Sequence, residues 1–295
     1  MAVEYKKIEG DELEALKQQI EMKFESAQAE GLSEEACGFL ADICANAIEE
    51  DFDWMLQRIV INGALVYRNW NNPVFTRYLR RAYEHGVACG DAGCCCNLGN
   101  MYHGDDALVD DIALAEELYQ LGAERGDGQA AVNLGYIYYY GRGEEGVNYT
   151  KAFKCYSHAV FIEDNTEALW KLGDMYAKGQ GVTKNEWMAW TLYSRAYNSS
   201  GRSTIACRAA HHMADMLMRG IEASSPQRCI EPDPERALRL YVEAEIGYQS
   251  AIDSGLTYYA RALRQAIEGQ QAAHAAIEEM HRKIREGAID TCAQS

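Results

Sequence analysis

The amino-acid sequence predicts an all-α fold, namely an α/α solenoid of antiparallel helix hairpins with helical caps at both ends. The first observation behind this prediction is the pattern Leu-Gly-x-x-Tyr. Its copies begin at Leu98, Leu134 and Leu172, spaced by 36 and 38 residues. The second is the pattern Ala-x-x-x-Tyr, which follows each copy. These second patterns begin at Ala115, Ala152 and Ala189. Self-similarity at this period is typical of stacked helical repeats.

Length and composition agree with a solenoid. A single core would be large for 295 residues, whereas each repeat of a solenoid needs only its neighbours. Apolar residues make up 48% of the chain, enough for a continuous core, and only four prolines interrupt it. Because proline breaks helices, its scarcity favours long helices.

Residues 1–50 are predicted to form an N-terminal helical cap. Residues 9–28 carry an apolar stripe at helical spacing, and Ser33 is placed as the N-cap of a second helix that runs to about Glu50. Neither segment shows the repeat pattern. A solenoid has to cover the open apolar face of its first repeat, and this segment is predicted to do so.

Residues 51–251 are predicted to hold the repeats, and residues 252–295 a C-terminal capping helix and tail. The predicted repeats are 51–91, which is degenerate, 92–127, 128–165, 166–204, and 205–251, which is also degenerate. In the last of them Met213-Ala214 replaces Leu-Gly, and its loop is lengthened at Glu222–Pro226.

The letters of the motif have a packing interpretation. Two helices approach closely only where side chains are small, so Gly99, Gly135 and Gly173 are predicted to admit the neighbouring helix. The leucines and tyrosines of the motif are predicted to fill the space between the helices. Glycines in the loops after Tyr140 and Lys178 are placed to end the first helices.

With these residues in view, the chain resembles the Sel1-like repeat family, relatives of the tetratricopeptide repeats. The segment Ala168–Val182 matches the family pattern almost throughout, and Ala130–Gly143 matches nearly as well. The copy at 94–123 departs, because Cys94 replaces an alanine and Asp105-Asp106 replaces the glycine loop. The resemblance implies an α/α solenoid that serves as a protein-interaction scaffold or adaptor.

In the related tetratricopeptide arrays, the first helix of each repeat lines a concave groove. Transferred to this chain, the groove positions are Cys96, Asn100, His103, Val132, Tyr136, Tyr139, Trp170, Asp174, Lys178, His211 and Asp215. This mixture of aromatic, amide and charged side chains suits a peptide-binding groove. The alternative is that Trp170 and Tyr139 pack against adjacent helices while the polar members are only solvated.

The net charge of −17 argues against nucleic acid and against an anionic membrane surface as partners. A strongly acidic surface mainly keeps a protein soluble, and secondarily favours a basic partner. The sequence shows no secretory signal and no run of 18 apolar residues, so a cytoplasmic location is expected. The ten cysteines are then expected to stay reduced.

No catalytic, cofactor or metal site is predicted. The run Cys94-Cys95-Cys96 cannot face one metal ion, because successive helical residues point about 100° apart. Cys96, Asn100 and His103 share a helix face, but the cysteine and the histidine lie about 10 Å apart along it, too far to activate a thiol. The set His211, His212 and Asp215 has no second cluster to complete a coordination sphere.

The sequence therefore predicts a non-enzymatic scaffold that binds a partner protein or an extended peptide in the concave groove. One alternative is a β-lactam-binding or β-lactam-hydrolysing enzyme, because a cysteine-rich branch of the family has been linked to that chemistry. Only Cys89 and Cys95 echo the cysteine pair of that branch. A purely structural homo-oligomer is a further alternative, and the oligomeric state stays open.

Overall fold

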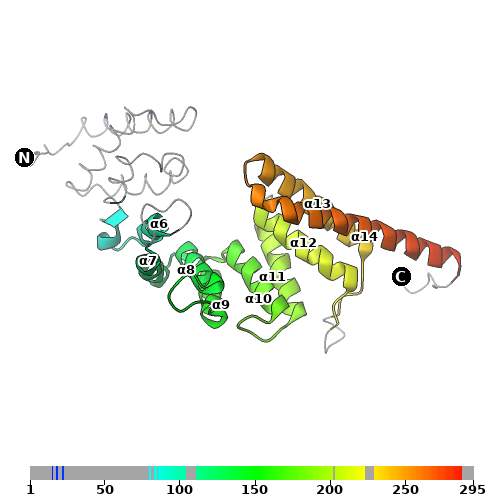
Figure 1. Ribbon diagram of the computed structural model, residues 1–295, viewed down its shortest axis with the longest axis horizontal. Coiled ribbons are helices and arrows are strands. Elements are labelled where there is room, and N and C mark those ends of the chain that lie inside the picture. The colour runs from blue at the N-terminus through cyan, green and yellow to red at the C-terminus, as the bar shows by residue number, and fades with distance from the viewer. Residues whose placement is uncertain are drawn as a thin grey trace, which may run out of the picture. The chain divides into compact units, whose positions relative to one another are not determined.

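The computed structural model describes residues 86–103, 111–201, 203–222 and 229–287, together with Ala15, Gln18, Met22, Arg80, Tyr83 and Glu84. In these residues the regular structure is helical, apart from an antiparallel bridge between Ile221 and Ile230 (Figure 1). Apart from Ala15, Gln18 and Met22, the predicted N-terminal cap lies outside the described residues, as do most of the degenerate repeat 51–91 and the tail 288–295.

The chain divides into two compact units, residues 1–146 and 147–295. The described helices of the first unit are α6 (Ala92–Tyr102), α7 (Ile112–Glu124) and α8 (Gly128–Tyr140). Those of the second unit are α9 (Tyr149–Glu163), α10 (Thr166–Lys178), α11 (Glu186–Ser199), α12 (Thr204–Arg219), α13 (Pro234–Asp253) and α14 (Ala260–Arg285), with a 3₁₀ helix at Thr257–Tyr259.

A polar side chain caps the start of each helix from α6 to α13. At α6 the Asp91 carboxylate accepts a hydrogen bond of 2.6 Å from the backbone N–H of Cys94. The capping residues are Asp91, Asp111, Asp127, Asn148, Asn165, Asn185, Ser203 and Asp233. Each cap contributes about 1 kcal/mol, so these residues fix where the helices begin. Helices α8 and α10 end at Gly141 and Gly179, both left-handed, as the glycine loops predict.

The packing role predicted for Gly99 and Gly173 is confirmed, and that of Gly135 stays a prediction. A Cβ atom built on Gly99 of α6 would lie 2.6 Å from the Tyr119 ring of α7. In the copy that begins at Leu172, a Cβ atom on Gly173 of α10 would lie 2.7 Å from the Tyr193 ring of α11. Carbon atoms do not approach so closely, so each tyrosine ring lies directly against a glycine of the preceding helix.

The second unit has a continuous apolar core that joins its repeats. It runs from Leu169 and Trp170 on α10, through Tyr193 on α11 and Met213 on α12, to Tyr241 on α13. The lengthened loop between α12 and α13 is closed by the backbone bonds between Ile221 and Ile230, 2.8 and 2.9 Å long.

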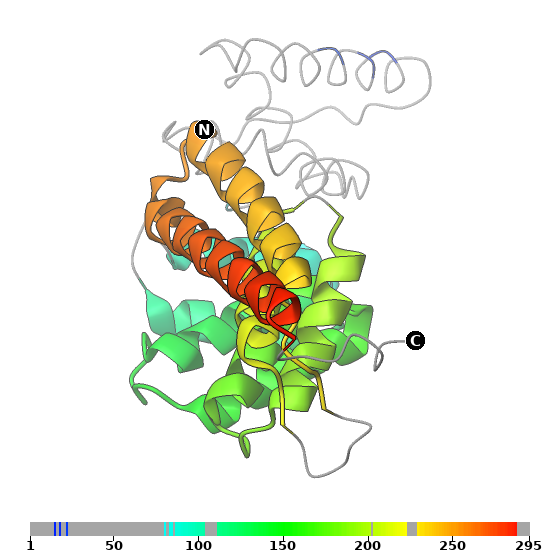
Figure 2. The same cartoon turned by 90° about the vertical axis from the view of Figure 1, so that its right-hand side faces the viewer.

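Helix α14 covers the C-terminal side of the second unit and lies along α13 (Figure 2). They lie close together at Gly269, where a Cβ atom would lie 2.5 Å from the Tyr241 ring. A smaller core cluster includes Ala244, Tyr248, Tyr259 and Ala266. Outside these contacts α14 is mostly exposed, which is the arrangement of a terminal helix with a polar outer face.

Candidate functional site

A recurring hydrogen bond links the two helices of three repeats. The hydroxyl of Tyr119 donates to Oδ1 of Asn100 (2.7 Å), that of Tyr193 to Oδ1 of Asp174 (2.6 Å), and that of Tyr241 to Oδ1 of Asp215 (2.6 Å). In each case the acceptor is the residue directly after the motif glycine, or after Ala214, which replaces it. The tyrosine of the motif therefore also holds a first-helix polar side chain in a fixed position, a role that the packing interpretation missed.

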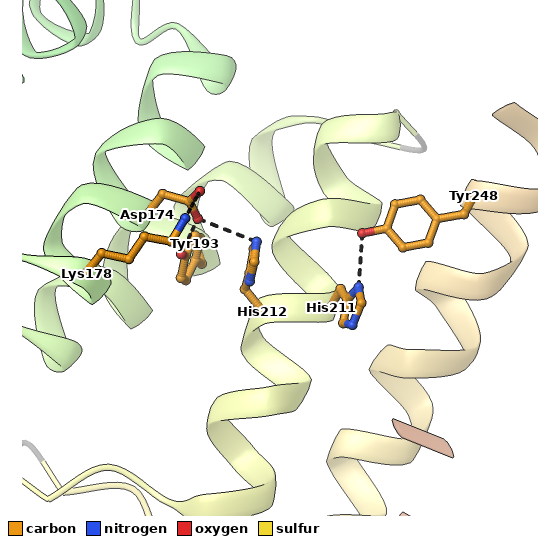
Figure 3. A network of polar contacts seen from close by, with 6 residues as sticks. All are labelled: Asp174, Lys178, Tyr193, His211, His212 and Tyr248. Atoms are coloured by element: carbon orange, nitrogen blue, oxygen red, sulfur yellow. Dashed lines mark hydrogen bonds and ion pairs between the residues drawn. The ribbon is translucent and has the colours of Figure 1, made fainter. Parts of the chain in front are cut away.

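Asp174 is the centre of a polar network in the second unit, drawn in Figure 3. Its side chain is only 7% exposed, and it meets Nζ of Lys178 at 3.1 Å and Nε2 of His212 at 3.5 Å. Burial raises the pKa of the Asp174 carboxyl, but His212, Lys178 and the Tyr193 hydroxyl lower it by more. The net pKa lies below the usual range, so Asp174 is a carboxylate at neutral pH.

The two adjacent histidines of α12 occupy an aromatic environment. The rings of His211 and His212 stack at 6.1 Å, and His212 also stacks on Tyr193 at 5.1 Å. The Tyr248 hydroxyl lies 3.2 Å from Nδ1 of His211 (Figure 3). Burial lowers the pKa of both imidazoles, more than the neighbouring carboxylates of Asp174 and Asp215 raise it. Both rings are therefore neutral at pH 7, and Lys178 is the charged partner of Asp174.

Trp170 joins this network as a packing residue. It is 4% exposed and stacks on His212 at 6.2 Å. The Arg208 guanidinium lies 3.6 Å from the centre of its ring, in the position of a cation–π contact. Its indole N–H has no hydrogen-bond partner among the described residues. Trp170 therefore packs against the neighbouring helix α12, which carries both Arg208 and His212.

The eleven predicted groove positions differ in exposure. Lys178 and Asp215 are exposed, and Asn100, His103, Tyr136 and Tyr139 are half-buried. The buried ones are Cys96, Val132, Trp170, Asp174 and His211. Val132 is 0% exposed, so its side chain is enclosed and does not reach a surface where a partner could bind. It packs inside the unit because α8 carries apolar side chains on most of its circumference.

In the first unit the structure brings three predicted residues together around one cavity of about 290 Å³. These are Asn100, His103 and Tyr136. The remaining lining residues are Tyr119, Asn133, Tyr140 and Arg142. Sequence reasoning missed Asn133, Tyr140 and Arg142. Arg142 could have been found from the sequence, because it is the charged residue between Gly141 and Gly143 in the loop that ends α8.

A larger cavity of about 780 Å³ lies between α11, α12 and α13, away from the predicted positions. Small residues such as Gly201, Ala206 and Gly247 are among those that line it. The Tyr197 hydroxyl donates to Glu243 in its wall, and this bond raises the pKa of Tyr197 to about 12. The Tyr197 hydroxyl and the Glu243 carboxylate are therefore hydrogen-bonded to each other in the wall of this cavity.

The described cysteines are free thiols, and the buried Cys94 and Cys95 lie in environments that disfavour the thiolate. Burial, followed by the nearby Asp91 carboxylate, raises the pKa of Cys94 far above its usual value. Burial also raises the pKa of Cys95, although Arg125 opposes it. A thiol reacts as the thiolate, which these environments disfavour. Among the described residues, no group of three or more His, Cys, Asp or Glu side chains could hold a metal ion.

Comparison with known proteins identifies the repeats. The family model described as Sel1 repeat matches residues 92–127, 128–159, 166–200 and 207–244. The chain carries four Sel1 repeats. The matches include the copy that departs from the pattern at Cys94 and the one with Ala214 in the glycine position.

Two solved structures are similar to the Sel1 repeat chain. A Sel1 repeat protein from Oxalobacter formigenes has a TM-score of 0.52 and 20% identity, covering 80% of this chain and 84% of that one. The c5321 protective antigen of uropathogenic Escherichia coli strains, which displays an SLR fold, has a TM-score of 0.55 and 22% identity, covering 90% and 57%. The fold is therefore an all-α helical-repeat solenoid, as the sequence predicts.

Two curated relatives come from Arabidopsis thaliana. They are the ERAD-associated E3 ubiquitin-protein ligase components HRD3A, 35% identical over 94 residues, and HRD3B, 33% identical over 85 residues. These alignments cover 32% and 29% of the Sel1 repeat chain, but only 13% and 14% of the relatives. None of the helices in the described part of the chain combines the length and the apolar character needed to cross a membrane.

Proposed function

We propose that this Sel1 repeat protein is a non-catalytic interaction scaffold, and that the first helices of its repeats bind a segment of a partner protein. The observation that carries the proposal is the recurring tyrosine hydrogen bond. It fixes Asn100, Asp174 and Asp215 on first helices, so these polar groups lose little conformational entropy when a partner binds.

The surroundings of these fixed groups suit protein recognition. Exposed Lys178 lies beside Asp174, and half-buried aromatic side chains such as Tyr136 and Tyr139 accompany Asn100 in the first unit. Aromatic side chains and preorganised charges are common anchors at protein interfaces. The names of the two Arabidopsis relatives describe components of a ubiquitin-ligase assembly, which is consistent with repeats that hold protein partners together.

Affinity capture from the native host, with mass spectrometry, tests the proposal. The informative variant is Lys178→Ala/Asp215→Ala, which removes two exposed first-helix charges. The matched control, Lys154→Ala/Glu231→Ala, removes one charge of each sign at exposed positions elsewhere on the second unit. We expect the first variant to lose partners that the control keeps. A folded Lys178→Ala/Asp215→Ala protein that keeps every partner would refute the assignment.

The same preparation separates the two alternatives. The β-lactam-processing alternative predicts turnover of nitrocefin by the pure protein, whereas we expect none. A purely structural homo-oligomer predicts a stable multimer in light scattering together with an empty partner list. We propose a cytoplasmic location, in keeping with the free thiols of the described cysteines.

A further inference from the structure

The cavity of the first unit has an unusual charge for so acidic a protein. The chain carries a net charge of −17, yet the side chains around this cavity are amides, phenols, one imidazole and one guanidinium. Among its described lining residues there is no carboxylate. The formal charge at the cavity is therefore set by Arg142.

A chain of hydrogen bonds fixes the orientation of the Asn100 amide. Nε2 of Gln129 donates to Oδ1 of Asn133 (3.1 Å), and Nδ2 of Asn133 donates to Oδ1 of Asn100 (3.0 Å). The Tyr119 hydroxyl donates to the same Asn100 oxygen (2.7 Å). Since Oδ1 accepts both bonds, the Asn100 amide nitrogen is left as a donor at the cavity. Its N–H groups have no hydrogen-bond partner among the described residues.

Arg142 supplies the second donor group. Its Nη1 lies 3.1 Å from Nε2 of His103, and its guanidinium lies 5.8 Å from the centre of the Tyr140 ring. A guanidinium only donates, so Nε2 of His103 accepts and the imidazole is the neutral tautomer with its proton on Nδ1. The contact uses one of five guanidinium N–H groups, and the side chain is exposed enough to offer others to a ligand.

The aromatic walls strengthen what these donors can bind. Tyr136 and Tyr140 stack at 5.8 Å with their planes 11° apart, and His103 meets the edge of Tyr119 at 6.1 Å. The Tyr140 ring lies within cation–π distance of the guanidinium and helps to position it for a charge-assisted hydrogen bond. A volume of about 290 Å³ lies at the small end of ligand pockets and suits a single side chain.

We infer that this cavity binds the side-chain carboxylate of an aspartate or glutamate in the partner segment. Arg142 and the Asn100 amide are its donors. The inference rests on the proposed function, since it names the chemistry that one first-helix site of the scaffold recognises. One guanidinium and one amide match the single charge and two oxygens of a carboxylate, whereas a doubly charged phosphate calls for more cations.

The site reverses the expectation drawn from net charge. The acidic composition favours a basic partner, but the local donors select an acidic residue. The acidic side chains Glu116, Glu117, Glu144 and Glu145 line a neighbouring cavity that shares Arg142. Of these, Glu116 already accepts a hydrogen bond of 2.6 Å from Tyr138. Because the glutamates of the neighbouring cavity would repel a further negative charge, we expect the partner carboxylate to reach Arg142 through the cavity lined by Tyr136 and Tyr140.

The test is selection of peptides by the full-length chain from a synthetic octapeptide library, acetylated and amidated so that only side chains supply carboxylates. Wild type is compared with Arg142→Gln and with Asn100→Asp. The second substitution keeps an acceptor for Tyr119, because aspartate occupies the same motif position at Asp174 and Asp215. Arg195→Gln is the control, since it removes one exposed positive charge far from this cavity in the sequence.

We expect wild type and Arg195→Gln to enrich Asp or Glu at one peptide position. Peptides selected in this way should bind Arg142→Gln and Asn100→Asp about tenfold or more weakly, the effect of losing one charge-assisted hydrogen bond. Circular dichroism establishes that each variant is folded. An Arg142→Glu variant that enriches Lys or Arg at the same position would support the inference further.

Three results with selected peptides overturn the inference, and so does a library without any binder. Wild type enriches peptides without an acidic position, Arg142→Gln binds the acidic peptides as tightly as wild type does, or phosphoserine is preferred to glutamate at that position. Each of them leaves the scaffold function intact, because it concerns only this site. A library that yields no binder overturns the inference, and the proposed function fails only if capture with the Lys178 and Asp215 variant also shows no change.

Discussion

Replacing the motif tyrosines by phenylalanine, one at a time, tests what the recurring hydrogen bond contributes. The change removes only the hydroxyl, so the ring that packs against the motif glycine stays. At Tyr193 the lost bond has a buried carboxylate as its acceptor, since the Asp174 side chain is 7% exposed. At Tyr241 the acceptor is Asp215, which is exposed, and water can replace the hydroxyl.

The expected losses differ for that reason. A hydrogen bond to a buried charged group contributes about 1.5–3 kcal/mol, and we expect Tyr193→Phe to lower the free energy of unfolding by about 2 kcal/mol. Tyr241→Phe should cost about 0.5–1 kcal/mol, because solvation of Asp215 offsets most of the loss. Tyr119→Phe, where the acceptor is the neutral amide of Asn100, should cost about 1 kcal/mol.

Urea denaturation followed by tryptophan fluorescence measures the comparison within one unit when Trp54 and Trp70, which belong to the first unit, are replaced by phenylalanine in every variant. Trp170, Trp187 and Trp190 all belong to the second unit, as do Tyr193 and Tyr241. Equal losses for the two substitutions, or no loss at Tyr193, would show that burial of the acceptor does not govern the bond. The tyrosine would then act through its ring alone, as the packing interpretation of the motif predicts.

Further predictions concern packing, acidification and thiols. Gly173→Ala should destabilise the second unit by about 1–2 kcal/mol, because a Cβ 2.7 Å from the Tyr193 ring overpacks the contact by more than the gain in helix propensity; thermal unfolding measures it. The pKa values of His211 and His212 are lowered, so below about pH 6.5 the unfolded chain binds more protons and the measured free energy of unfolding should fall. The lowered pKa of Asp174 adds a second loss below about pH 3.8, and a loss confined to the lower range would contradict the assignment of neutral histidines. Denatured, unreduced protein should show ten reactive thiols, and a smaller number would contradict the cytoplasmic proposal.

The sequence predicts the described part of the fold closely because its signals are local and repeated. Gly99 and Gly173 appear in register with Tyr119 and Tyr193, so one physical interpretation of the pair applies to each copy. The helix starts are equally local, since Asp, Asn and Ser caps need only the following three residues. Ala214 replaces the motif glycine, but the repeat still aligns with the others, because Tyr241 bonds to the residue that follows Ala214.

The candidate site was harder to predict because its members come from different kinds of segment. Groove positions transferred from related repeats lie on first helices, so they include Asn100 and omit Arg142, which lies in a loop. They also include Val132, because spacing along a helix does not reveal that neighbouring helices enclose that side chain completely. The exposure of a side chain depends on packing around the whole circumference of its helix. Counting positions from the motif glycine does not reveal that packing.

The residue after the motif glycine shows how one scaffold can present different chemistry. A tyrosine of the second helix holds that residue in place in three repeats, so its identity decides what the position offers. As Asn100 it accepts with its oxygen and leaves amide N–H groups as donors at a cavity. As Asp174 it has no N–H group to offer, and its buried charge is balanced instead by Lys178. The same hydrogen bond thus preserves the packing of the hairpin, while the identity of this one residue decides whether the position also carries N–H donors or only acceptor oxygens.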